Sequence, residues 1–371
     1  MNTAQIYDIV NSVTSQALGR DDLEAVDTAS FIAMGDAILS SNTNTEPFIN
    51  TLVQRIARTV VSFRAYDSKW KELAITDVDF GRIMQKVKVA MPEFVSDVSV
   101  ELEDGETVDP YIISKPVAHQ KLFVVRSPYT CFVTIQRHWL KEAFTSEDAM
   151  ESFISAIFGE MQNAQAVALE NLGRACVSNF IANMGDSQKV HLLTGYLADV
   201  PGATAGLTAQ QAMYDAGFLR YAMGQMKYYS DRMTEMSVLY NKEGETRHTP
   251  ITDQRFLIRS DYLNHMETQV DYAAFNDRYL KKAADLTVNF WQGAEEPGTI
   301  IVKGGEGEED IEIENILGFI HDRDALGLFR KDVETLTTPV NARGRYYNVF
   351  QHVDDMRFND LSENGILFLV D

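Results

Sequence analysis

LGFIH at residues 317–321, followed by the polar corner DRD at 322–324, opens the stretch of sequence that decides the fold. NARGR at 341–345 is a predicted turn, and Tyr346–Val353 beyond it alternates large and polar residues. Gly365–Val370 is a further predicted strand. These patterns indicate paired strands that return the chain into a sheet. The stretch holds no set of ligand residues, which favours a structural component over a catalyst.

Length and composition indicate a large globular protein. The chain has 371 residues, more than the roughly 250–300 at which a single core stops growing, so we expect at least two subdomains. A hydrophobic fraction of 45% is ordinary for a globular protein. The net charge of −21 argues against wrapping nucleic acid through phosphate contacts, which need a dense lysine and arginine surface.

The cysteines and the N-terminus indicate where the protein is made. Cys131 and Cys176 are too few for a disulfide framework and fit a reducing compartment, as small core residues. Residues 1–18 have neither the basic nor the apolar region of a signal peptide. No window approaches the ~18 consecutive apolar residues of a membrane span. We therefore expect a soluble protein made in the cytoplasm, with no membrane contact.

The first third of the chain predicts an arm and a projecting ribbon. Residues 1 to about 46 have short apolar helical spacing and predict an arm with weak helices. Phe48–Tyr66 begins with helical spacing and becomes β-branched, which predicts a helix that passes into a strand. Within 68–128, Lys86–Val89 and Asp97–Leu102 alternate with period two, and Asp104-Gly105 is a hairpin signal. A lone two-stranded ribbon is marginally stable, so we expect it to pack on something outside its own domain, for which a neighbouring subunit is one candidate.

The middle of the chain predicts a long helix and a second subdomain. Thr145 to Asn183 has a capping-box-like start, and at 1.5 Å per residue it could extend about 55 Å as a spine. The turn-rich segment 185–206 predicts a subdomain boundary. Thr208 and Gln211 predict the capped start of a second helix that continues to Met233. Phe256–Ile258 is a predicted buried strand.

Two segments imitate ligand-binding loops. GGEGEED at 304–310, between predicted strands Ile300–Val302 and Ile311–Ile313, has carboxylates that would repel an anion, so we interpret it as a solvated hairpin tip. Asp322, Asp324 and Gly327 imitate an EF-hand start. Leu326 and Val333 stand where calcium ligands belong, so the match fails.

No other pattern predicts a catalytic or metal site. There is no HExxH and no G-x-S-x-G, and neither cysteine has the flanking glycines of a nucleophile signature. The carboxylate pairs 77/79, 295/296 and 354/355 are interpreted as solvated faces. The histidines are interpreted as surface or interface residues: His119, His138, His191, His248, His265, His321 and His352. We therefore predict no catalytic, cofactor-binding or metal-ligating residues, no cofactor and no enzymatic activity.

Four segments resemble one family in the same order along the chain. They are FINTLVQRI at 48–56, TIQRHWLKEAF at 134–144, FIHDRD at 319–324 and NARGRYYN at 341–348. They are similar to segments of the major capsid proteins of small, short-tailed, protein-primed bacteriophages. The resemblance covers most of the chain from about residue 48 onward.

The resemblance implies an α+β architecture, the Johnson fold of tailed-phage shells. In order, its parts would be an N-terminal arm, the entry to the P-domain, an E-loop, the P-domain with its spine helix, an A-domain, and return strands to the P-domain. These would occupy 1–47, 48–67, 68–128, 129–185, 186–335 and 336–371. We expect no decoration domain after residue 371 and no scaffolding segment before the arm.

The resemblance also implies a function and partners. Copies of the chain would form pentamers and hexamers of an icosahedral head shell around phage DNA, in a virion made in the host bacterial cytoplasm. The expected partners are a separate scaffolding protein, a portal protein, decoration proteins, and packaged double-stranded DNA without sequence-specific contact. We further expect the acidic balance to keep the inner wall from adhering to DNA.

Two alternatives stay open at this point. An encapsulin, a cellular shell protein of the same fold, is the nearer one, although encapsulins are shorter and begin with a cargo-binding helix that the polar N-terminal segment fits poorly. A metal-dependent hydrolase that uses Asp322 and Asp324 is the alternative from another class.

Overall fold

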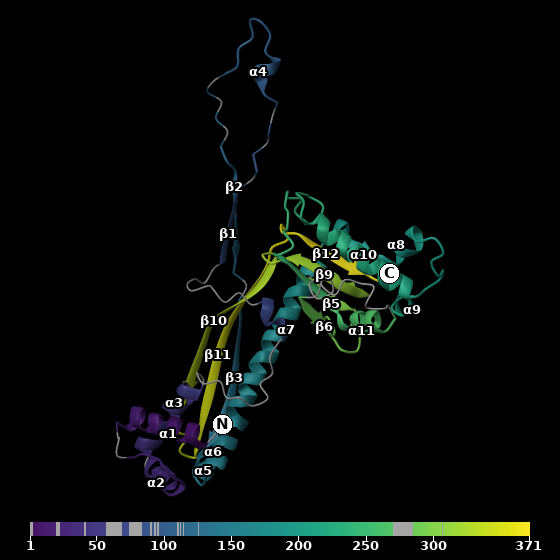
Figure 1. Ribbon diagram of the computed structural model, residues 1–371. Coiled ribbons are helices and arrows are strands. Elements are labelled where there is room, and N and C mark those ends of the chain that lie inside the picture. The colour runs from purple at the N-terminus through teal and green to yellow at the C-terminus, as the bar shows by residue number, and fades with distance from the viewer. Residues whose placement is uncertain are drawn as a thin grey trace.

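The computed structural model has three connected regions and a projecting ribbon (Figure 1). A helical end contains the N-terminus, a long sheet and helix form the middle, and a second lobe contains the C-terminus. The structure describes the following residues: 3–19, 23–40, 42–56, 69–73, 84–89, 91–92, 94, 96–109, 111, 113, 115–124, 126–269, 285–305 and 307–371.

The helical end buries the apolar side chains of the N-terminal segment. It contains α1 (Thr3–Leu18), α2 (Thr28–Leu39), α3 (Asn42–Ile56), α5 (Arg137–Ala143) and α6 (Glu147–Ile154). The rings of Phe31 and Phe48 lie 5.5 and 5.6 Å from that of Phe144, and all three are buried. An arm with weak helices was predicted here, and the structure shows helices whose apolar residues are buried within the same chain. Its helical spacing gives each helix an apolar stripe that the same chain covers.

The middle of the molecule is a three-stranded antiparallel sheet, here called the long sheet. Its order is β10 (Leu326–Thr337), β11 (Tyr346–Asn359) and β3 (Arg126–Gln136). β11 extends beyond the predicted strand Tyr346–Val353. The strand expected after the helical half of 48–66 falls on residues that lie outside the described ones.

The predicted spine is confirmed. α6 continues through a π-helical turn, η2 (Ser155–Gly159), into α7 (Glu160–Ala182). The cap is Ser146 rather than Thr145, and its hydroxyl accepts a hydrogen bond from the Ala149 amide at 3.2 Å. A Cβ on Gly173 of α7 would lie 3.0 Å from the Trp70 Cβ, so η1 (Lys69–Leu73) packs closely on the spine there.

The lobe is built on a five-stranded sheet. Its order is β4 (Lys189–His191), β12 (Gly365–Leu369), β9 (Ile316–Asp322), β5 (Gln254–Arg259) and β6 (Leu286–Val288). Helices α8 (Leu192–Asp199), α10 (Ala216–Arg232) and α11 (Ser260–Gln269) share one apolar cluster with it, and the C-terminal half of α7 shares another. The sheet is therefore packed on both faces.

Other lobe elements are short. η3 (Asp186–Gln188) precedes β4, and β7 (Ile300–Val302) pairs antiparallel with β8 (Ile311–Ile313), as predicted for the acidic hairpin. The Thr208–Gln211 capping box is confirmed, but its helix, α9, is only Ala209–Ala212. The predicted continuation to Met233 is wrong, because Asp215 caps a new helix through the Phe218 amide.

The pairing of the last strands differs from the expected division of the chain. β10, expected mostly in the region 186–335, pairs in the long sheet, whereas β12 lies in the lobe and not with the other strands of 336–371. The corner 322–324 carries the chain from the lobe to the long sheet. The corner at Asp360–Asn364 returns it to the lobe. Because the spine has already carried the chain from β3 to β4, the described strands cross between the two sheets three times.

The ribbon is formed by β1 (Met84–Val89) and β2 (Ala118–Phe123), which pair antiparallel and project from the body (Figure 1). The predicted strand at 97–102 is wrong, because Val98–Glu101 forms the short helix α4. The turn at Asp104-Gly105 is present, with Gly105 at φ +100°. Its place at the far end of the ribbon makes 96–109 the tip.

Candidate assembly surfaces

The base of the ribbon is held to the body by an ion-pair cluster. Lys86 and Lys88 of β1 and Lys121 of β2 point to the same side of the ribbon, since strand side chains alternate. Their Nζ atoms lie 2.8, 3.1 and 2.9 Å from carboxylate oxygens of Asp360. Lys86 and Lys88 also lie 2.6 and 2.8 Å from Glu363 Oε1. The corner between β11 and β12 therefore provides the anions that fix the ribbon.

The Asp360 carboxylate is the hub of this base cluster. Its side chain is 0% exposed, and burial alone would raise its pKa. Hydrogen bonds from Lys86, Ser362 and Lys121 outweigh burial and hold its pKa well below the ordinary range. The pKa of Glu363 is likewise lowered by Lys86 and Lys88 against the effect of burial. A buried, fully paired carboxylate of this kind is costly to leave without its partners.

The opposite side of the ribbon is apolar and exposed. Val87 is 60% exposed, and Val89 and Leu122 are also more than half exposed. Beyond the strands, Phe94 and Tyr111 are almost wholly exposed. Contiguous exposed apolar residues mark interaction surfaces in proteins that otherwise bury them. One side of the ribbon therefore contacts the body of its own subunit, and the other side is exposed and available for contact with another molecule.

A second exposed apolar surface crosses the long sheet. Leu336, Phe350 and Phe132 are directly opposite one another in the strand register, and we call them the apolar row. The rings of Phe132 and Phe350 are 5.9 Å apart, and Phe132 is 67% exposed. On the other side of the sheet, Val349 and Tyr347 are buried in the core of the helical end. The outer side of the sheet is therefore a second candidate for subunit contact.

The two loops that imitate ligand sites use their carboxylates internally. Asp322 Oδ2 accepts a hydrogen bond from the Thr249 hydroxyl at 2.7 Å, and Oδ1 accepts one from the Asp324 amide at 2.8 Å. Burial raises the pKa of Asp322. In the acidic hairpin, the Gly304 amide donates to Asp310 Oδ1 at 3.1 Å, so a carboxylate of the chain occupies a donor that a phosphate would need. Among the described residues, no group of three or more histidine, cysteine or acidic side chains could hold a metal ion.

The remaining sequence candidates have structural surroundings. Cys176 donates to Asn359 Oδ1 at 2.9 Å, and burial raises the pKa of its thiol to about 12. His321 is buried rather than at the surface, and burial lowers its pKa to about 4. Cys131 is a half-buried free cysteine beside the core of the helical end.

The three carboxylate pairs have different outcomes. The pair at 295/296 is exposed, as interpreted, whereas 77/79 lies outside the described residues. The interpretation is wrong for Asp355, which is fully buried and accepts a hydrogen bond from the Tyr129 hydroxyl at 2.8 Å. Asp354, its neighbour, pairs with Arg126. Asp355 follows Val353 at the two-residue spacing of the buried side of β11, and that periodicity was the signal that could have placed it.

The fold is shared with solved phage capsid structures. A chain in the capsid structure of Staphylococcus phage Andhra aligns with a TM-score of 0.54 and 12% identity, over 84% of this chain and 86% of that one. A chain in the structure of the head fibre and inner core protein gp22 of native bacteriophage P68 aligns with a TM-score of 0.57 and 10% identity, over 84% and 87%. These similarities define the class: a mixed α and β chain with the Johnson fold of phage capsids.

The family follows from the sequence. A profile described as Phi29-like phage major capsid protein matches residues 9–369. The major capsid protein of Bacillus phage PZA is 22% identical over 376 residues, covering 100% of this chain and 74% of that protein. That of Bacillus phage GA-1 is 22% identical over 185 residues, covering 49% and 38%. The chain belongs to the Phi29-like phage major capsid protein family.

Family membership confirms the predicted function at the level of the shell. The chain is a phage major capsid protein, a structural component of the virion head. Among the described residues, no helix is both long enough and apolar enough to cross a bilayer.

Proposed function

We propose that copies of this chain assemble into pentamers and hexamers that close into an icosahedral shell around packaged double-stranded DNA. The projecting ribbon supports this most directly, because its apolar side cannot be buried by the body that holds its base. A contact between one copy's ribbon and a different surface of the next copy is heterologous, and such contacts close into rings when the rotation between copies allows it. The apolar row supplies a surface of matching character.

Within this proposal we assign the parts of the fold as follows. The ribbon region 68–128 is the E-loop, and the five-stranded lobe is the A-domain. The spine and the long sheet are the P-domain, which takes β10 from the expected A-domain segment 186–335. β12 joins the A-domain, and the N-terminal helices, expected as an arm over 1–47, join the P-domain because their apolar residues are buried there.

The partners and the place of synthesis are part of the same proposal. A separate scaffolding protein, a portal protein and decoration proteins would act on the shell, and the chain would be made in the host bacterial cytoplasm. The net charge of −21 supports weak adhesion between the shell and DNA. A strongly basic inner wall in an assembled particle would contradict that part. The shell role also supports a chain without enzymatic activity.

The ribbon is the part to remove in a test. Residues 91–117 would be replaced by a short Gly-Ser turn that leaves β1 and β2 intact, and assembly with the scaffolding protein would be followed by sedimentation velocity and negative-stain microscopy. We expect closed particles from the native chain. The shortened variant should stay monomeric with near-native far-ultraviolet circular dichroism.

A matched control shortens the other hairpin, replacing 304–310 by the same Gly-Ser turn. This variant should assemble like the native chain if the ribbon has a specific role. Closed particles of native size from the 91–117 variant would overturn the proposed role of the ribbon.

A further inference from the structure

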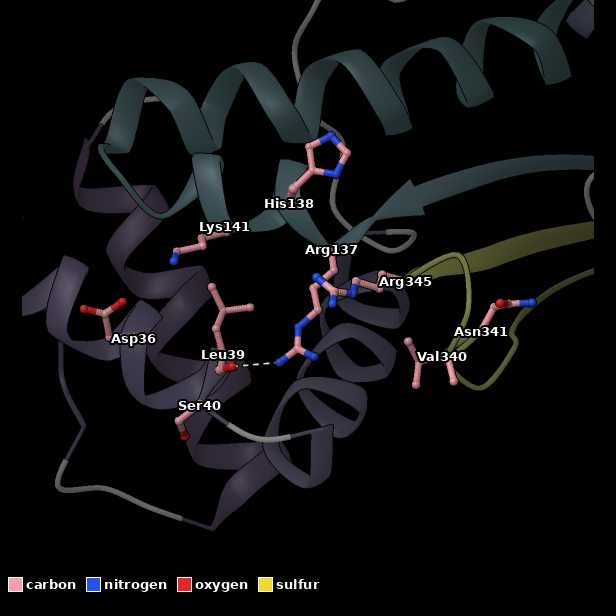
Figure 2. Close-up of a pocket in the computed structure, with 10 residues that line it drawn as sticks. Asp36, Leu39, Ser40, Arg137, His138, Lys141, Val340, Asn341 and Arg345 are labelled. Carbon is pink, nitrogen blue, oxygen red and sulfur yellow. Dashed lines mark hydrogen bonds between the residues drawn. The ribbon is translucent and has the colours of Figure 1, made fainter.

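A hollow of about 800 Å³ lies at the helical end (Figure 2), and the ribbon projects at the opposite end of the molecule (Figure 1). Three elements border it: the C-terminal end of α2, the helix α5, and the turn between β10 and β11. Its size falls in the roughly 300–1,000 Å³ range of ligand-binding sites. In an assembly of copies, this hollow is a concave surface that can receive a protruding part of another subunit.

The hollow is cationic, although the chain as a whole is strongly acidic. Arg137 and Lys141 line it from α5, and Arg345 lines it from the turn. Asp36 is the single carboxylate among the described residues that line it, so these residues carry two net positive charges against −21 for the chain. Such a local reversal of sign favours an anionic occupant.

The cationic side chains are mounted on a rigid frame. The Arg137 guanidinium donates to the Leu39 carbonyl at 2.8 Å, which ties α5 to α2 (Figure 2). The Arg137 amide donates to the Arg345 carbonyl at 3.0 Å, which ties α5 to the turn. Asn341 Oδ1 accepts from the Gly344 amide at 2.8 Å, and Arg345 has φ 51°. The Arg137 guanidinium and the backbone positions that carry Lys141 and Arg345 are therefore set before any partner arrives.

The tip of the ribbon has the complementary chemistry. Residues 96–109 contain six acidic side chains and no lysine or arginine. Val100 is 84% exposed, and Leu102 and Val108 are exposed beside the carboxylates. Leu39 and Val340 give the hollow apolar walls for such side chains. The tip and the hollow thus match in both charge and apolar character.

The occupant of the hollow must come from another molecule. The ribbon tip and the helical end lie at opposite ends of the protein, so a chain cannot fill its own hollow (Figure 1). A nucleic acid backbone would match the cations but not the apolar walls. The acidic hairpin at 304–310 uses Asp310 on its own amide, which leaves the ribbon tip as the better match.

We propose that the basic hollow of one subunit receives the acidic tip, residues 96–109, of the ribbon of a second copy. Lys141 and Arg345 bind its carboxylates, and the contact fixes how far the ribbon extends across the neighbour. This inference rests on the proposed assembly. It adds a specific electrostatic lock to the apolar contacts.

Charge reversal with rescue tests the pairing in the full-length chain. K141E/R345E and, separately, E101K/E103K should each lower the yield of closed particles by roughly tenfold or more, because like charges at a contact are costly. The four substitutions together should restore the yield. R220E/K303E and E308K/E309K are the matched controls outside the contact, and neither should change it. Thermal unfolding of each soluble monomer should stay near the native value.

Zero-length carbodiimide coupling gives a direct readout. In native particles, mass spectrometry should find Lys141 joined to a carboxylate in 96–109, and K141R should remove that product. Lys141 joined to 308–310 instead would overturn the assignment of the tip.

Other outcomes separate the inference from the assembly proposal. Native yield from K141E/R345E overturns the lock and leaves the shell proposal standing, whereas the absence of closed particles from the native chain removes the shell proposal itself. Variant shells of native yield that have lost only their DNA would show that the hollow binds nucleic acid, which overturns the lock.

Discussion

The N-terminal helices and the ribbon are both rich in apolar residues, yet the chain treats them in opposite ways. Phe31 and Phe48 are buried against Phe144, whereas Phe94 and Val87 of the ribbon are exposed. The helices are stabilised by burial within the chain, whereas the apolar side of the ribbon is exposed and would be covered only in the proposed assembly. Apolar content alone therefore does not identify an interface. A candidate interface is indicated where the geometry of the chain prevents it from burying its own apolar residues.

Truncating the helical-end core should have the largest effect on the isolated chain. F144A should lower the free energy of unfolding by about 3–5 kcal/mol, because it leaves a cavity among three aromatic rings. F94A on the ribbon should change it by less than about 0.5 kcal/mol. Urea denaturation of the soluble monomer measures both. Equal losses of unfolding free energy in F144A and F94A would contradict the distinction between the buried helical end and the exposed ribbon.

Removing the hub of the base cluster should have the next largest effect. D360N leaves Lys86, Lys88 and Lys121 without their shared anion, and the local cost should be about 3 kcal/mol. Hydrogen exchange should show lost protection in β1 and β2, with the lobe unchanged. Glu243 also pairs with Lys121, at 2.5 Å, and its side chain is 40% exposed, so E243Q should cost less than about 1 kcal/mol. Undiminished protection in D360N would mean that the ribbon is held by other contacts.

Acid should loosen the same base. The pKa values of Asp360 and Glu363 are lowered in the folded protein, so their stabilisation is fully present above their unfolded values, about 4. It is lost as the pH falls through the lower folded values. Protection of β1 and β2 should therefore be constant from about pH 7 to 5 and decline below about pH 4. D360N, already loosened at neutral pH, should show a smaller acid response.

The apolar row should show the smallest effect on the monomer. F132T places a β-branched residue on the strand and changes the exposed side of the long sheet, so the free energy of unfolding should change by less than about 1 kcal/mol. The yield of closed particles should nevertheless fall. T130V, one row away, is the control. Unchanged assembly of F132T would exclude the apolar row from the subunit contact.

Elements with a strong local period were predictable from sequence. The apolar spacing from Met150 onward gave the spine, and the alternation in Tyr346–Val353 gave most of β11. The ribbon was predicted as a region, but its outer strand was placed at 97–102, where α4 lies. Alternation indicates a strand when one side of it is buried, and Asp97, Val100, Glu101 and Leu102 of this segment are all exposed.

The assembly surfaces were harder to predict because they join distant residues. Lys86 and Asp360 are separated by most of the chain, and no local pattern links them. The basic hollow likewise combines α2, α5 and the turn before β11. The burial of Asp355 was missed for a different reason. Neighbouring acidic residues are common by chance in so acidic a chain, so the pair 354/355 was interpreted as solvated.

The position of β12 has a consequence for the order of events in the cell. This strand lies between β4 and β9 in the lobe sheet, yet it is the last strand to be synthesised of those that the structure describes. A nascent chain that has already formed its spine and ribbon still lacks the interior of its lobe. The lobe sheet can therefore be completed only after every strand of the long sheet has been synthesised.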